Sequence, residues 1–254
     1  MVGVALGVSL VAYGNRWAET GELDEAGLSA IALRHVTRLR FLVGGDNLVL
    51  LAETPRIWYR ALERLGSRSL RLTIDPRPRD LDEVVHHGIG AAPLWAPFTY
   101  GSERDMIWHV AQRRVAGVGF EFDLLGTTAP PDQRPEAGDV EQARIELTRA
   151  LVEAGDVAAE RGDDEWASRF ERALSAMEDP GAMEEDGNRG LLPVGYATVE
   201  HRQLLAAAAY AYVFGDGGWC EWEGNENSSR RELARVALNL YVATTNAIQA
   251  AVNV

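Results

Sequence analysis

The sequence predicts an α+β protein, with a mixed α/β module over residues 1–126 and an acidic helical bundle over residues 139–254. The apolar pattern changes from short runs with a period of two to long runs with a helical period. The charge changes at the same place: residues 1–135 hold 15 Arg and 16 acidic residues, whereas residues 136–254 hold 10 Arg and 22 acidic residues. A proline-rich connector over 126–138 separates the two halves.

In the first module, large and small residues alternate over 2–10, which predicts a strand. A Gly-containing turn joins alternating runs at 37–43 and 48–52, and this arrangement is typical of a β-hairpin. A helix over 55–65 follows, with Thr54 as its N-cap and Pro55 at its first position.

The rest of this module continues to mix strands and helices. Residues 70–74 alternate in the manner of a strand, and a turn follows at 75–78. The spacing of apolar residues around 106–111 predicts a helix. A last strand is expected over 118–124, and the hairpin in this series favours α+β over a purely parallel α/β sheet.

The second module is predicted to be helical over 140–159, 163–177, 198–214 and 229–252. The second of these helices begins with three acids, which suits the positive end of the helix dipole. Four such helices favour a bundle. The last helix carries an apolar stripe formed by Leu233, Val236, Ala237, Leu240, Tyr241 and Ile248.

Composition excludes several functions. All 25 basic residues are Arg, so chemistry that needs a lysine amine, including Schiff-base formation, is excluded. A pI near 4.9 disfavours nucleic acid as a partner, and no apolar run is long enough to predict a membrane span. A single Cys excludes an internal disulfide and fits the cytoplasm. Zinc-type spacing and a full dinucleotide-binding motif are both missing, so no metal or cofactor is expected.

Three histidines each follow an acid by four positions, which on a helix would place the carboxylate beside the ring. Such pairs could supply a general base in a cleft between the two modules. The alternative function is therefore a hydrolase-like or transferase-like enzyme. The pairs are Asp82 with His86, Glu83 with His87, and Asp105 with His109.

Residues 214–225 combine glycines, two tryptophans and several acids, a composition that suits a protein-binding loop. We expect the tryptophans to anchor a partner and the acids to pair with its Arg or Lys side chains. The alternative is a connector whose tryptophans cap the bundle. The candidate binding residues are Asp216, Trp219, Glu221, Trp222 and Glu223.

The run from 208 to 214, followed by Gly215, Gly218 and Trp219, and the ending at 250–253 resemble uncharacterised bacterial helical domains with a VFGGMGSWND-type loop. The resemblance covers about residues 140–254, and Asp216, Gly217 and Glu221 depart from the pattern. Such domains are associated with toxin–immunity gene neighbourhoods. The acidic second half, the loop over 214–225 and the lack of a coherent catalytic set predict a non-enzymatic protein that binds a basic partner, and the resemblance adds that this is an immunity-type protein with a toxin-like partner. A structural homo-oligomer is a third possibility.

Overall fold

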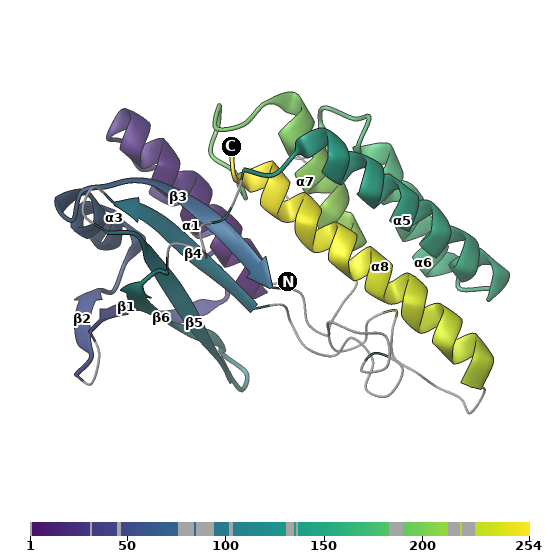
Figure 1. Cartoon of the computed structure of the whole chain (residues 1–254), viewed down its shortest axis with the longest axis horizontal. Helices are drawn as coiled ribbons and strands as arrows, with labels where there is room; N and C mark the ends of the chain where they lie inside the picture. The colour runs from purple at the N-terminus through teal and green to yellow at the C-terminus, as the bar shows by residue number, and fades with distance from the viewer. Residues whose placement is uncertain are drawn as a thin grey trace.

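The computed structural model describes residues 2–30, 32–44, 47–75, 84, 94–101, 104–130, 135, 137–182, 190–212, 219 and 227–254. Within these residues the chain forms a six-stranded mixed sheet at one end of the molecule and a group of long helices at the other (Figure 1). The predicted α+β class is confirmed. The architecture changes from sheet to helices between residues 128 and 140, where the sequence predicts a connector.

The sheet has the order β2-β1-β6-β5-β4-β3. Its strands are β1 (Val36–Val43), β2 (Val49–Ala52), β3 (Ser67–Asp75), β4 (Leu94–Gly101), β5 (Met106–Val115) and β6 (Gly119–Thr128). Strands β1 and β6 pair in parallel, and all other neighbours are antiparallel. The β1–β2 hairpin confirms the sequence prediction, with Leu42 opposite Leu50.

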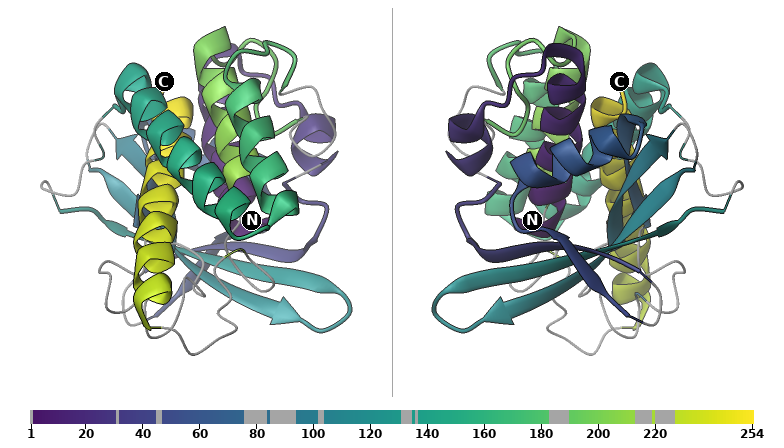
Figure 2. Two further views of the ribbon diagram at one scale, coloured as in Figure 1. Left: turned by 90° about the vertical axis from the view of Figure 1, so that its right-hand side faces the viewer. Right: turned by 90° about the vertical axis from the view of Figure 1, so that its left-hand side faces the viewer.

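Helices α1 (Val2–Thr20), α2 (Glu25–Ala30) and α3 (Pro55–Arg64) belong to the sheet end of the molecule. In the views of Figure 2 the helices lie on one side of the sheet. The start of α3 is as predicted: the Ile57 amide donates a hydrogen bond to the hydroxyl of the N-cap Thr54 at 3.4 Å. This cap fixes where the chain turns from β2 into the helix.

The strand predicted over 2–10 is wrong, because these residues form the first half of α1. Every residue from Gly3 to Gly14 is buried except the partly buried Ala5, so this part of the helix is enclosed and shows no polar face. A Cβ added at Gly7 would lie 2.5 Å from the Trp95 ring, and one at Gly14 would lie 2.8 Å from the Tyr59 ring. The small residues therefore allow close helix packing.

The helix predicted around 106–111 is also wrong, because these residues begin strand β5. Trp108 faces the core, whereas His109 and Ala111 face the side of the sheet that carries no helix. Because the outer face of the strand is only partly polar, apolar and polar residues do not alternate clearly in the sequence, and the spacing of the apolar residues resembles that of a helix.

The four predicted helices of the second half are confirmed as α5 (Val140–Glu160), α6 (Asp164–Ala176), α7 (Val199–Ala211) and α8 (Asn227–Val252). Helix α5 packs on α6 and α8, and α7 packs on α6 and α8, which closes a four-helix bundle. All six residues of the predicted α8 stripe are buried. The bundle and the helix-covered face of the sheet share one hydrophobic core, so the predicted division into two domains stays a prediction.

Side-chain amides seal the outer edge of strand β3. The Leu70 amide donates to Asn15 Oδ1 at 2.7 Å, and Asn15 Nδ2 donates back to the Leu70 carbonyl at 2.9 Å. The Leu72 amide and carbonyl make the same pair of bonds with Asn253, at 2.7 and 2.9 Å. An exposed row of strand amides can pair with other chains, and here helices α1 and α8 occupy that row.

Further bonds join these two helices to the chain that precedes α7. The Tyr196 hydroxyl donates to the Val252 carbonyl at 2.8 Å and accepts a bond from Asn15 at 3.0 Å. Burial raises the pKa of Tyr196 to about 12, so the phenol keeps its proton at neutral pH. Among the residues that the structure describes, every helix is too short or too polar to cross a lipid bilayer.

Candidate functional site

Helix α5 exposes two large aliphatic side chains on its solvent face. Ile145 is 46% exposed and Val152 is 48% exposed, and their spacing of seven residues places them on the same side of the helix. The opposite side is buried against α6 and α8 through residues such as Leu147 and Leu151. The exposed pair is therefore not part of the bundle core.

Exposed acids lie at both ends of this pair, and the exposed Arg149 lies between its two members. Glu141 lies one turn before Ile145, and Asp156 lies one turn after Val152, on the same exposed face. The connection from α5 to α6 continues the acidic surface through Glu160, Asp163, Asp164 and Glu165. This connection lies at the end of the molecule far from the sheet (Figure 1). We call the exposed face of α5 and this connection, residues 141–165, the acidic hairpin.

Some of these acidic residues do not stabilise the helix on which they lie. Asp163, Asp164 and Glu165 lie at the start of α6, where negative charge is favourable. Asp156 and Glu160 instead lie near the end of α5, whose last turn contains no basic residue. Carboxylates near the negative end of a helix dipole reduce helix stability, so the stability of α5 does not account for these two acids.

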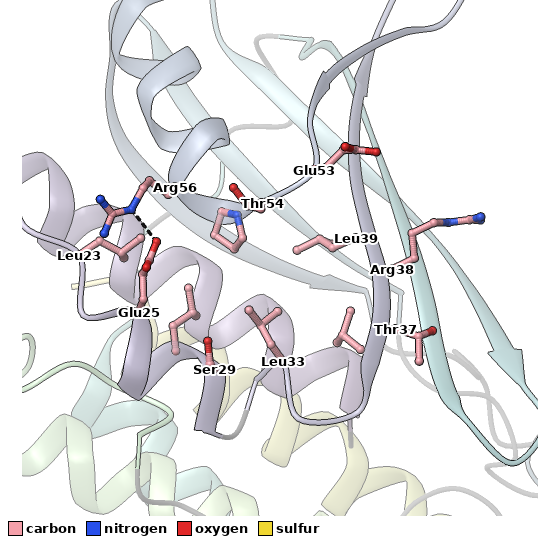
Figure 3. Close-up of a pocket in the computed structure, with 13 residues that line it drawn as sticks. Leu23, Glu25, Ser29, Leu33, Thr37, Arg38, Leu39, Glu53, Thr54 and Arg56 are labelled. Atoms are coloured by element: carbon pink, nitrogen blue, oxygen red, sulfur yellow. Dashed lines mark hydrogen bonds and ion pairs between the residues drawn. The ribbon is translucent and has the colours of Figure 1, made fainter.

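A cavity of about 400 Å³ lies elsewhere, between α2, β1 and the turn into α3 (Figure 3). Leu28, Leu33 and Leu39 supply apolar surface. Glu25 and Arg56 form an ion pair at 2.5 Å at its edge. The mixture of carboxylate, hydroxyl and leucine side chains suits a small amphipathic ligand.

The chemistry available in this cavity is limited. Its 13 lining residues include neither His nor Cys. Arg38 turns toward the helix-free face of the sheet, where its guanidinium pairs with Glu121 at 2.8 Å. Within the described ranges, no three His, Cys, Asp or Glu residues gather closely enough to hold a metal ion.

The helical pairing predicted for Asp105 and His109 is wrong, because His109 lies on β5 and Asp105 immediately precedes it. Four residues of strand span about 13 Å, so the two side chains are not neighbours. His109 Nε2 lies 3.1 Å from the Thr127 hydroxyl, and Asp105 accepts a bond from the Gly101 amide at 3.2 Å. The other candidates, Asp82, His86 and His87, fall outside the described residues.

The prediction that Trp219 is an exposed anchor is also wrong. Its side chain is 5% exposed and its ring lies edge-on to Phe170, with centroids 5.0 Å apart. Trp219 therefore caps the bundle core, as the alternative interpretation of this loop proposes. Its Nε1 is buried with no hydrogen-bond partner among the described atoms. Asp216, Glu221, Trp222 and Glu223 fall outside the described residues, so their role stays a prediction.

The helix-free face of the sheet carries a cross-strand row of charges. Arg40 binds Asp123 through two hydrogen bonds of 2.8 and 2.6 Å. Arg113 joins Arg38 on Glu121. The bond from Arg40 is the main reason why the pKa of Asp123 lies below its usual value. These charges are paired within the sheet, whereas Asp156 and Glu160 form no ion pair with any residue in the described part of the chain.

The sequence analysis missed Ile145 and Val152, although their signal is present. They are the large aliphatic residues of α5 that do not follow the spacing of its buried stripe. Comparisons with protein-family models, characterised proteins and solved structures find no match to this chain.

Proposed function

We propose that this protein is a cytoplasmic, non-enzymatic binding protein whose acidic hairpin docks a basic protein partner. The observation that carries the proposal is the exposed pair Ile145 and Val152 at the centre of an acid-rich surface. An apolar centre within a charged surround is the usual anatomy of a protein–protein interface. The resemblance noted above makes an immunity-type inhibitor of a basic toxin the form of this function to test.

The charges and the aliphatic pair have different roles in such an interface. The field of the acids accelerates encounter with a basic partner, and this contribution weakens as salt is added. Burial of Ile145 and Val152 supplies affinity that depends little on salt. Glu153 does not contribute a free charge, since it pairs with Arg235 of α8 at 2.7 Å. That ion pair joins α5 to α8.

The segment that contains Glu221 and Glu223 precedes α8, whose first residue is Asn227. The first turn of α8 lies at the same end of the molecule as the acidic hairpin (Figure 1). We therefore retain the loop acids as a second part of the proposed binding surface, and we assign the central apolar contact to α5 instead of to Trp219.

The first experiment is a pull-down from native host lysate in which the neighbouring genes are co-expressed. We expect one basic, neighbour-encoded protein to be retained and then released by added salt. The double variant Asp156→Arg/Glu160→Arg should lose this protein. A matched control, Glu22→Arg/Glu63→Arg, makes the same change in net charge at exposed positions at the sheet end.

The control variant distinguishes the loss of a local binding surface from a general effect of net charge on partner retention. Retention of the partner by the control and its loss from the hairpin variant support the proposal. Equal weakening in both variants would show that only net charge matters, and undiminished retention by the hairpin variant would remove the acidic hairpin from the interface. If the wild-type chain retains no basic protein, the proposed function is wrong.

A further inference from the structure

The two edge strands of the sheet, β3 and β2, differ in how the hydrogen-bonding groups of their outer sides are satisfied. At the β3 edge, Asn15 and Asn253 bond the backbone of Leu70 and Leu72, and Gln249 accepts a bond from the Ile74 amide at 2.8 Å. At the other edge, no described strand pairs with the outer side of β2. One edge is therefore closed by three buried or half-buried amide side chains, and the other is left open.

The open edge is also apolar. Leu48 is 54% exposed, Val49 is 60% exposed and Leu50 is 48% exposed, and they follow one another along the chain. Proteins normally protect an edge strand with Lys, Pro or an inward-pointing charge, and β2 itself contains none of these residues. Three consecutive exposed aliphatic residues at the start of an edge strand, whose outer side pairs with no described strand, indicate an interaction surface.

The charge distribution favours a second copy of this chain as the occupant. The edge lies in the half that is close to neutral, and it is at the opposite end of the molecule from the acidic hairpin (Figure 1). Two copies joined at β2 therefore place their acidic hairpins at the two far ends of the pair. At physiological salt the Debye length is about 8 Å, so repulsion across that distance is screened.

The sequence of the strand is compatible with pairing to itself. In an antiparallel pair related by a two-fold axis, a register centred on Val49 places Glu53 opposite residue 45, and one centred on Leu50 places it opposite Asn47. Both opposing residues are neutral. The bulge in the β1–β2 ladder lies beyond Leu50, so Val49 and Leu50 keep regular strand geometry.

We propose that two copies of this chain associate through antiparallel pairing of their β2 strands, which continues the sheet across a two-fold axis. Four residues of strand span about 13 Å, so the contact is small and the dimer is expected to be weak and dependent on concentration. This surface is independent of the acidic hairpin, and the two proposals can fail separately.

Sedimentation equilibrium of the purified chain, from about 5 μM to about 1 mM, measures the association directly. We expect a reversible dimer whose dissociation constant rises at least tenfold in Val49→Lys and in Leu50→Lys, because opposed Lys side chains repel across the axis. The matched control is Val118→Lys, since Val118 is 65% exposed in a turn at the other end of the strands and should leave dimerisation unchanged.

A cysteine scan tests the register. In a Cys220→Ser chain, single cysteines at positions 48, 49 and 50 should cross-link two copies under mild oxidation, with the fastest reaction at the residue nearest the axis. Val118→Cys should remain largely monomeric. If the chain stays monomeric at every concentration, the proposal is wrong, and the β2 edge would instead pair with a peptide of another protein. A dimer that forms equally well in both Lys variants also overturns it.

Discussion

Removal of the Asn253 side chain should destabilise the protein more than its position next to the last residue suggests. Asn253 is 4% exposed, and its amide satisfies both the N–H and the C=O of Leu72 on the edge strand. Asn253→Ala leaves two buried backbone groups without partners. Each such group costs about 1–3 kcal/mol, and some water will enter the space, so we expect a loss of about 2–4 kcal/mol.

Urea denaturation measures this loss. With an m-value of about 3 kcal/mol/M, the midpoint should fall by about 1 M. Asn239→Ala is the matched control, because Asn239 is exposed and lies on α8, the helix that ends directly before Asn253. Its effect should stay within about 0.5 kcal/mol.

Hydrogen exchange provides a second readout at the strand itself. The Leu72 amide should exchange faster in Asn253→Ala, and the amides of the central strand β6 should exchange faster only as far as global stability falls. The reasoning is refuted if Asn253→Ala loses no more stability than Asn239→Ala, because the edge would then not depend on these bonds.

Three further predictions concern packing and charge. Gly7→Ala should destabilise the fold by about 1–3 kcal/mol, because the added methyl group would overlap an indole ring. Gly155→Ala should stabilise the fold by about 0.5–1 kcal/mol, because Gly155 lies inside helix α5 and an added methyl group would have its nearest neighbour 4.0 Å away. Thermal unfolding compares the two variants, and equal effects would contradict the packing argument. Trp219→Ala should cost about 3–5 kcal/mol in chemical denaturation, and a change below about 1 kcal/mol would contradict its place in the core. Arg40 lowers the pKa of Asp123, so the contribution of Asp123 to stability is present above the unfolded-state pKa of about 4 and is lost as the pH falls through the folded-state pKa. Asp123→Asn should therefore be less stable than wild type at pH 7 and should approach the stability of wild type below pH 4. A stability difference between the two proteins that does not narrow at low pH would contradict this assignment.

The sequence predicted the elements whose signals are local. The Thr54 cap, the hairpin and the four helices of the second half all depend on residues close together in the chain. Helix α1 was missed because it is buried on all sides, so its composition lacks the polar face by which a helix is recognised. Its glycines at 3, 7 and 14 hold a helical spacing that alternation over 2–10 conceals.

The candidate site was harder to predict because it depends on exposure. Ile145 and Val152 depart from the spacing of the buried stripe of α5, but only the packing of the bundle shows that they face outward. Trp219 illustrates the opposite error, since a tryptophan among glycines and acids suggests an anchor but packs against Phe170. The sealing of β3 joins residues about 180 positions apart, and no local pattern indicates such a pairing.

The proposed function depends most on where the partner binds, and a hydrogen-exchange footprint of the complex measures this directly. The basic partner retained in the pull-down is added to the full chain, and exchange is followed with and without it. We predict slower exchange in residues 141–165 and at the start of α8, with no change at the cavity beside Glu25 or in β2. Protection confined to that cavity or to the sheet, with the acidic hairpin unchanged, would contradict the account.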